Sequence, residues 1–258
     1  MAASTDLLTA RIVLRAVLPI IKVLLEDDPK TRKKFQGVTA TVQFVADDPG
    51  GPMGAHITFD NGAFGVVHEI AEQPDLTFRF SSVKKMNALF AGKPVLPRIQ
   101  GIRNFTLLVK MLGVLMRLKL LMPNKAPRNP GEARLKVKLI LYMVSTALSQ
   151  LNKGGDPDMV KWTSKQPERI YQWSVEPEGI ACYLRVKAGK TKAGRGYYTR
   201  RKPIVHMKFA GVEGALPVLT NKVDTVQAMP QRLVENVGSP AFGGQIGDFM
   251  LHIARILT

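Results

Sequence analysis

The side chains of this chain that could perform acid–base or metal chemistry are few and scattered. Its four histidines belong to no motif for metal binding or nucleophilic catalysis; they are His56, His68, His206 and His252. The dipeptide Asn61-Gly62 predicts a two-residue hairpin turn, which would pair His56 with Val67. The same turn would pair His68 with Ala55, on the opposite face of the hairpin. This arrangement disfavours a metal ion shared by the two histidines.

The chain also lacks the motifs of common enzyme classes. It contains no Gly-x-Ser-x-Gly elbow, no Gly-x-x-x-x-Gly-Lys-Ser/Thr loop and no cysteine cluster. The lone Cys182 cannot form an internal disulfide, and the alternating run at residues 180–186 predicts a buried strand thiol rather than a nucleophile. Nothing here requires an oxidising compartment. We therefore assign no catalytic residue, metal ligand or cofactor.

Four glycines precede the last apolar run of the chain: Gly238, Gly243, Gly244 and Gly247. Their spacing fits no dinucleotide-binding fingerprint. We expect them to form a flexible entrance loop.

The charge of the chain is strongly positive. It has 37 Lys and Arg against 20 Asp and Glu, a net charge of +17, so its surface should attract nucleic acid, anionic lipid head groups or an acidic carrier. The densest charge lies at residues 187–202, which hold seven cations and no acid. The candidate anion-binding residues there are Lys190, Lys192, Arg195, Arg200, Arg201 and Lys202.

This basic segment, residues 187–202, has two interpretations of equal weight. It is either a solvated, flexible β-turn or a loop that faces the phosphates of a membrane surface or a carrier. Nucleic acid is less favoured, because no helix concentrates the charge and Tyr197 and Tyr198 are the only obvious stacking residues.

Apolar side chains near the end of each half could line a cavity. Residues 105–122 predict a helix that is apolar almost all round and rich in methionine, which adapts to irregular partners. Such a set forms either ordinary core or the wall of a ligand pocket. The candidate ligand-binding residues are Phe78, Phe80, Met86, Phe90, Leu107, Leu108, Met111, Leu112 and Leu115 in the first half, with Met207, Phe209, Phe249, Met250 and Ile253 in the second.

Neither long apolar run is predicted to cross a membrane. Cations interrupt residues 12–25, which are also shorter than the roughly 20 residues that a span needs, and cations in residues 105–122 would lie in hydrocarbon. Asp6 stands where a signal peptide would carry basic residues. We expect a cytoplasmic protein that can also contact membranes peripherally.

The chain reads as two copies of one α+β fold. Its 258 residues suit two domains, and alternating strands at residues 76–80 and 205–209 each run into a short helix and later a closing apolar helix. The proline- and asparagine-rich residues 123–132 predict a linker between a first domain, residues 1–122, and a second, residues 133–258.

Within each copy, helices and strands follow the same order. An apolar helix opens each half, at residues 12–25 and 134–151. Strands are expected at residues 38–45, 55–60, 63–70 and 76–80, and then at 170–175, 180–186, 196–201 and 204–209. Ser82 is the predicted N-cap of the helix to Ala91, and Gly92 is predicted to end it in the left-handed conformation. The closing helices are expected at residues 105–122 and 244–257.

This pattern resembles the sterol carrier protein type 2 family. The local matches are Ile57-Thr-Phe-Asp-Asn-Gly62, Pro74-Asp-Leu-Thr-Phe-Arg-Phe-Ser81, Leu89-Phe-Ala-Gly-Lys93 and Gly101. They span about residues 31–121, and a weaker match covers residues 168–257, where Asn221-Lys222 replaces the expected glycine-lysine. The resemblance implies two sterol-carrier-like domains, each with an antiparallel-rich five-stranded sheet whose helices enclose a hydrophobic ligand tunnel.

The expected function is binding or transfer of a hydrophobic ligand, such as a sterol, fatty acid, acyl-CoA or other lipid. The alternative is an enzyme that holds a hydrophobic substrate in the same pocket; its acid–base candidates are His68, Glu69, His206 and Tyr183. Because both opening helices are apolar over most of their circumference, we also expect the halves to unfold together.

Overall fold

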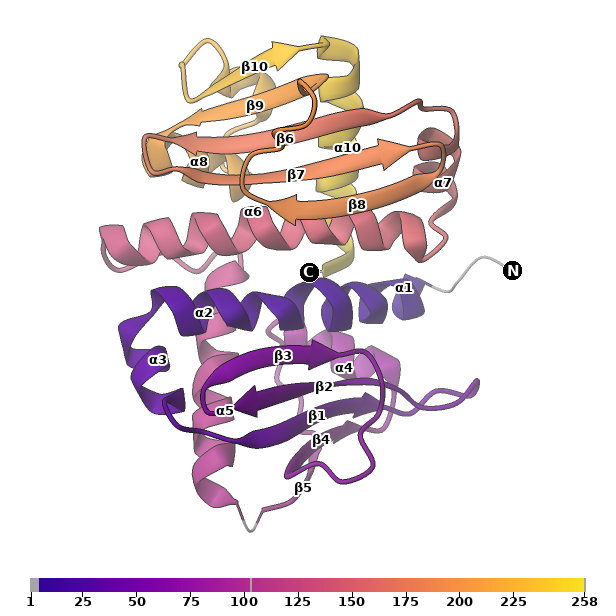
Figure 1. Ribbon diagram of the computed structural model, residues 1–258, viewed down its shortest axis with the longest axis vertical. Coiled ribbons are helices and arrows are strands. Elements are labelled where there is room, and N and C mark those ends of the chain that lie inside the picture. Colours follow the sequence, from indigo (N-terminus) through magenta and orange to yellow (C-terminus); the bar gives the residue numbers. More distant parts are fainter. Residues whose placement is uncertain (1–4, 103, 258) are drawn as a thin grey trace. The chain divides into compact units, whose positions relative to one another are not determined.

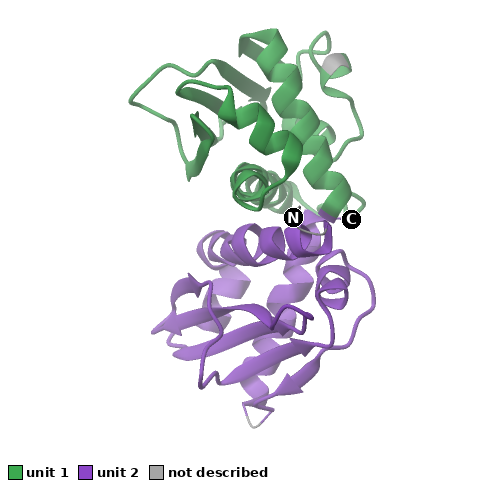
Figure 2. Ribbon diagram, turned by 90° about the vertical axis from the view of Figure 1, so that its right-hand side faces the viewer, with its two compact units in different colours: residues 1–3, 123–256 green, residues 4–122, 257–258 purple. Residues whose placement is uncertain are grey.

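The computed structural model describes residues 5–102 and 104–257 of the chain (Figure 1). The chain divides into two compact units, one ending at Met122 and the other beginning at Pro123 (Figure 2). We call them the N-terminal and the C-terminal unit. Each is an α+β structure with one five-stranded mixed sheet and helices packed against it.

The N-terminal unit opens with a continuous helical run. It consists of α1 (Thr5–Ile12), a π-helical turn (Val13–Val17), a 3₁₀ turn (Leu18–Ile20) and α2 (Ile21–Asp27). The helical run is therefore longer at both ends than predicted. Its α geometry is interrupted around Pro19, which has no N–H to donate to the preceding turn. A short helix, α3 (Pro29–Phe35), follows.

The sheet of this unit has the strand order β3-β2-β1-β4-β5. Its strands are β1 (Ala40–Ala46), β2 (Met53–Asp60), β3 (Ala63–Val67), β4 (Leu76–Phe80) and β5 (Arg98–Gln100). Only the central pair, β1 and β4, is parallel; the other three pairings are antiparallel. Asn61 and Gly62 both have positive φ and join β2 to β3, which confirms the predicted two-residue turn.

Two helices complete the unit behind the sheet as seen in Figure 1. They are α4 (Val83–Phe90) and α5 (Phe105–Leu118), the latter extended by a 3₁₀ turn (Lys119–Leu121). The Ser82 side chain accepts a hydrogen bond from the Lys85 amide, and Gly92 has φ 80°, so both predicted ends of α4 are confirmed.

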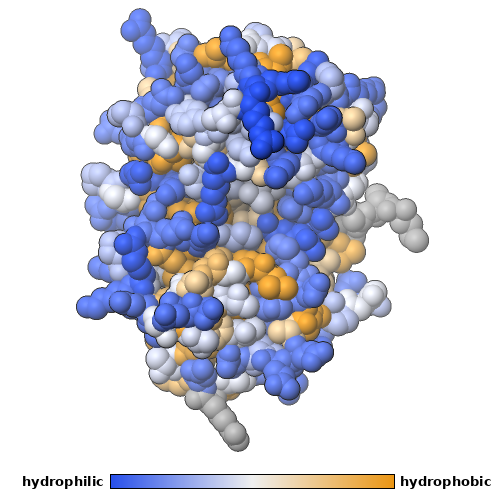
Figure 3. Space-filling view, viewed as in Figure 1, coloured by the Kyte–Doolittle hydropathy of each residue, from blue (hydrophilic) through white to orange (hydrophobic). Residues whose placement is uncertain are grey.

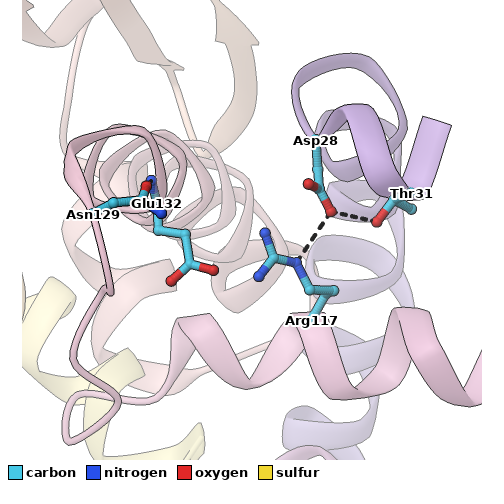
Figure 4. Close-up of polar contacts among 5 residues, drawn as sticks. All are labelled: Asp28, Thr31, Arg117, Asn129 and Glu132. Carbon is cyan, nitrogen blue, oxygen red and sulfur yellow. Dashed lines mark hydrogen bonds and ion pairs between the residues drawn. The ribbon is translucent and has the colours of Figure 1, made fainter. Parts of the chain in front are cut away.

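The C-terminal unit begins with α6 (Pro130–Lys153), which starts inside the segment predicted as linker. The Asn129 side chain accepts a hydrogen bond from the Glu132 amide, and Pro130 fits the first helical turn, where no N–H partner is required (Figure 4). α7 (Pro157–Ser164) follows and is capped in the same way by Asp156.

The second sheet has the order β10-β9-β6-β7-β8, which is the connectivity of the first sheet. Its strands are β6 (Arg169–Glu176), β7 (Ile180–Lys187), β8 (Lys190–Arg195), β9 (Val205–Ala210) and β10 (Val234–Gly238). Again only the central pair, β6 and β9, is parallel. The remaining helices are α8 (Gly211–Leu219), α9 (Thr225–Ala228) and α10 (Pro240–Leu257).

Corresponding backbone positions repeat between the units. α4 is ended by Gly92, and α8 is ended by Asn221 with φ 55°; the amide of the next residue bonds back to the helix at 2.9 Å in both cases. Asparagine is the residue that best replaces glycine in this left-handed conformation. At the end of the last strand, a side chain on Gly101 or Gly238 would collide with the backbone carbonyl of the residue just before the neighbouring strand. The unexpected Asn221 therefore fulfils the role of the glycine.

Two predictions about local structure are wrong. A strand lies at β8 instead of residues 196–201, because Ala188 and Gly189, both with positive φ, turn the chain earlier than expected. The predicted flexible glycine loop is largely helix, since α10 begins at Pro240 and includes Gly243, Gly244 and Gly247.

Candidate functional site

The C-terminal unit contains a cavity of about 500 Å³ bounded by α6, β9, α8 and α10, which we call the C-terminal cavity. Met207 and Phe209 of β9 form part of its wall on the sheet side, and Ile140 and Val144 contribute from α6. The segment after α8 and the part of α10 from Pro240 to Ala254 complete it. This volume lies within the range of about 300–1,000 Å³ that is common for small-molecule sites.

One face of α10 is shaped for this cavity by glycine. The lining residues of α10 recur three or four positions apart and include Gly243, Gly244 and Gly247. A Cβ atom on Gly244 or Gly247 would meet no atom within 4 Å, whereas one on Gly243 would collide with the Asn236 side chain. Glycine in a helix interior costs roughly 0.5–1 kcal/mol relative to alanine. The open space is thus kept at the expense of helix stability.

Several polar side chains, which we call the polar rim, also line the cavity. Asp224 and Thr225 lie at the start of α9, and Asp248 lies on α10. Asn236 of β10 also lines the cavity, and its side-chain oxygen is buried without a hydrogen-bond donor among the described residues. A buried acceptor in this state costs about 1–3 kcal/mol until a donor reaches it.

The N-terminal unit has a groove of about 480 Å³ in the corresponding place, between the end of α4 and the closing helix α5. We call it the N-terminal groove. Phe90, Leu112 and Leu115 line it, together with the chain at residues 92–95. No strand residue is among its described lining residues. It therefore lies between helices and does not reach the sheet.

The sequence-predicted ligand residues of the first half divide between groove and core. Phe90, Leu112 and Leu115 line the groove, as stated. The others are at most 8% exposed and lie outside the groove lining; they are Phe78, Phe80, Met86, Leu107, Leu108 and Met111. Phe78 stacks on Phe44 at a ring distance of 5.0 Å, and Phe44 also contacts Phe90. These aromatic rings fill the space between sheet and helix that we expected a ligand to occupy.

In the second half, Met207, Phe209 and Met250 line the cavity, whereas Phe249 and Ile253 do not. Phe249 contacts the Trp162 ring at 5.2 Å, and Ile253 is fully buried. On α10, Gly243, Gly244 and Gly247 thus line the cavity together with Met250 and Leu251, whereas Phe249 and Ile253 pack elsewhere. Sequence reasoning missed Gly244, Gly247 and Asn236. The available signal was glycine at helical spacing, which we interpreted as a loop.

The closing helix α5 is held to α3 by a polar contact. Asp28, at the start of α3, is only 7% exposed and accepts hydrogen bonds from Thr31 Oγ1 at 2.5 Å and from Arg117 Nε at 3.1 Å (Figure 4). A partly buried, charge-assisted pair of this kind fixes geometry more than an exposed one.

The side of the C-terminal unit seen in Figure 3, which is the sheet side, is covered mainly by hydrophilic side chains. The six predicted anion-binding residues are all exposed. Some already have protein partners: Arg195 stacks over the Tyr142 ring at 5.0 Å, and Arg201 donates to the Glu168 carbonyl at 3.3 Å. The hydrogen bond from Arg185 lowers the pKa of the Glu168 carboxyl group. The basic segment is therefore part strand and part loop, and it is anchored to the sheet.

The acid–base candidates do not meet at either site. None of His68, Glu69, His206 and Tyr183 is among the described residues that line the cavity or the groove. His206 Nε2 lies 2.8 Å from Ser174 Oγ, and burial followed by Lys208 lowers its pKa. Burial, then Arg15 and Arg11, lowers the pKa of His68. Within the hairpin, His56 pairs with Val67 as predicted, whereas β3 ends before His68.

Cys182 is a buried strand thiol, as predicted. It is fully buried on β7, its Sγ donates to the Leu141 carbonyl at 3.4 Å, and burial raises its pKa to about 12. The nucleophilic form is the thiolate. This cysteine is thus unsuited to nucleophilic chemistry.

Within residues 5–102 and 104–257, no group of three or more His, Cys, Asp or Glu side chains is arranged to hold a metal ion. No helix in this part of the chain is long and apolar enough to cross a membrane.

Comparisons with known proteins identify no family. No family description matches the chain, and no curated protein matches it. Among solved structures, a double mutant of the sec-alkyl sulfatase PisA1 matches with a TM-score of 0.29 and 15% identity, over 64% of this chain and 29% of that one. The stereoselective inverting sec-alkylsulfatase Pisa1 from Pseudomonas sp. matches with a TM-score of 0.26 and 15% identity, over 58% of this chain and 28% of that one. The resemblance to sterol carrier proteins stays a prediction.

Proposed function

We propose that this protein binds a hydrophobic ligand in the C-terminal cavity, with the N-terminal groove as a second site. The observation that carries the proposal is the glycine face of α10, because Gly244 and Gly247 leave open space beside an apolar wall. Burying a ligand there would contribute about 25 cal/mol per Å² of apolar surface. The polar rim would orient the ligand's head group.

Filling the cavity provides the sharpest test. Gly247→Leu should raise the free energy of unfolding by about 1 kcal/mol, since it removes a helix-interior glycine and adds apolar contacts. The same change should weaken ligand binding at this site by at least about tenfold, because the new side chain occupies the space. Binding of long-chain alcohols would be followed by native mass spectrometry, and stability by urea denaturation.

The matched control is Gly113→Ala on α5, which lines neither site. A Cβ there would make an ordinary contact with Lys34 Nζ at 3.8 Å. This variant should gain stability and keep ligand binding. Unchanged binding in Gly247→Leu, with the gain in stability present, would contradict the proposal.

A second candidate function is peripheral association with an anionic membrane. Phe105, Val109, Leu112 and Met116 form a stripe on α5, the α5 stripe, whose side chains are 45–66% exposed. No Asp or Glu occurs between Asp75 and Glu132, so the chain around the stripe carries only positive formal charge. Exposed apolar side chains among cations favour the surface of a bilayer that contains anionic lipid.

Vesicle sedimentation tests this candidate. Replacing Phe105 and Val109 with Gln leaves Leu112 and Met116 in the groove and should reduce binding to vesicles of phosphatidylcholine and phosphatidylserine by about tenfold or more. Val160→Gln, at an apolar side chain on α7 that is 41% exposed, is the control and should bind like the parent. Equal losses in both variants would remove the α5 stripe from the mechanism.

A further inference from the structure

The two sites differ in the charge of their walls. The described lining residues of the C-terminal cavity include Asp224 and Asp248 and no Lys or Arg. Those of the N-terminal groove include Lys93 and Lys119 and no Asp or Glu. In a chain of net charge +17, an acidic wall opposes the general trend of the surface.

A carboxylate or phosphate in the C-terminal cavity would lie in a partly apolar space beside two carboxyl groups. Asp224 and Asp248 are exposed, so solvent screens them, and each would repel an anion about 4 Å away by roughly 1 kcal/mol. The same head group in the N-terminal groove would lie near two ammonium groups instead, which stabilise it. A cationic head group is favoured beside the carboxyl groups of the C-terminal cavity, and a neutral head group is not repelled there.

Asn236 adds a second requirement at the C-terminal cavity. Its side-chain oxygen is buried at the wall and receives no hydrogen bond from the described residues. A ligand hydroxyl or amine could donate to it once the Asn236 side chain rotates toward the cavity, whereas an ether or an ionised carboxylate has no proton to donate. Sites that present an unsatisfied acceptor discriminate strongly against analogues that lack the donor.

We propose that the two sites divide ligands by head group. The C-terminal cavity takes a long-chain ligand with a neutral or cationic, hydrogen-bond-donating head group, such as an alcohol or amine. The N-terminal groove takes a long-chain ligand with an anionic head group. This inference rests on the proposed function and specifies the ligand class of each site.

The test uses ligands that share one alkyl chain: hexadecanol, hexadecylamine, palmitate and hexadecyl methyl ether. Each would be delivered from cyclodextrin to the full chain, and bound ligand counted by native mass spectrometry and by displacement of a fluorescent fatty alcohol. In Gly247→Leu, hexadecanol and hexadecylamine binding should be lost while palmitate binding persists. In a Lys93→Glu and Lys119→Glu double variant, palmitate binding should fall at least about tenfold while hexadecanol binding persists.

Two further variants separate the contributions of charge and hydrogen bonding in the C-terminal cavity. Replacing Asp224 and Asp248 with Asn should let palmitate enter, with a gain of at least about tenfold and little change for hexadecanol. Asn236→Leu should abolish the preference for hexadecanol over its methyl ether, which we expect to be about fivefold to tenfold in the parent. Circular dichroism and urea denaturation establish that each variant is folded.

The outcomes separate this inference from the proposed function. If palmitate and hexadecanol bind the parent equally and both are lost in Gly247→Leu, selection by head group is wrong while ligand binding stands. If none of the ligands binds, the proposed function fails and this inference fails with it.

Discussion

At the scale of single residues, burial is the main influence on the pKa values of the reactive side chains Cys182 and His68. Cys182 and His68 both lie in environments that disfavour their charged forms. The burial of Cys182 could be predicted from the sequence, because strand alternation places its side chain inward. The environment of His68 could not be predicted, since its neighbours Arg11 and Arg15 come from the first helical run and no spacing rule relates them to the hairpin. Such long-range proximity requires the fold.

The lowered pKa of His68 predicts a pH dependence of stability. Its folded pKa lies below the unfolded value of about 6.5, so the unfolded state takes up the proton first as pH falls. The contribution of His68 is therefore complete above about pH 6.5 and is lost as pH falls from there toward the folded pKa. His68→Asn should flatten the stability profile in this window, as measured by urea denaturation.

A companion variant identifies the cause of the shift. Arg15→Gln removes one of the two cations that lower the pKa of His68, so the ring should titrate at higher pH in an NMR titration. An unchanged titration would leave burial and Arg11 as the causes of the lowered pKa. A stability profile of His68→Asn that parallels the parent would contradict the linkage itself.

At the scale of elements, sequence patterns predicted most helices and strands, and the errors have physical causes. The alternation in β4 and the capping residues of α4 are local signals, and both were correct. β8 was misplaced because its sequence is basic and only weakly alternating, so its position is set by pairing with β7. The glycines of α10 looked like a loop because glycine is a poor helix former. Their helical state depends on the core that the other face of α10 forms with its neighbours.

The difference between local sequence signals and tertiary packing also explains which site residues could be predicted. Hydrophobicity alone does not separate a wall from a core, and Phe249 and Met250 are adjacent on α10 yet only Met250 lines the cavity. In the first half, Phe78 was chosen for its apolar character, and it packs against Phe44 instead. A cavity is defined by the side chains that are small or missing, and this depends on how three or four elements meet.

At the scale of the whole chain, the unequal distribution of charge sets the long-range behaviour. All acidic residues of the N-terminal unit occur at or before Asp75, and the basic segment concentrates seven cations in the C-terminal unit. In the membrane association that we propose, attraction to an anionic surface would come from the net charge of +17, and insertion would come from apolar side chains such as the α5 stripe. The two contributions respond differently to salt.

Binding to anionic vesicles should therefore weaken with salt without vanishing. The screening length falls from about 10 Å at 0.1 M to about 3 Å at 1 M ionic strength, which suppresses the electrostatic part and leaves the apolar part. Replacing Arg200, Arg201 and Lys202 with Ser should reduce binding at low salt, by roughly 1 kcal/mol per cation that faces the lipid, and have little effect at high salt.

The Gln variant of the α5 stripe should show the reverse salt dependence. Its largest loss of binding should occur at high salt, because electrostatic attraction no longer compensates for the missing insertion. Sedimentation of both variants across a salt series measures the two contributions separately. Binding that is insensitive to salt in the parent would show that the positive charge plays no part in membrane association.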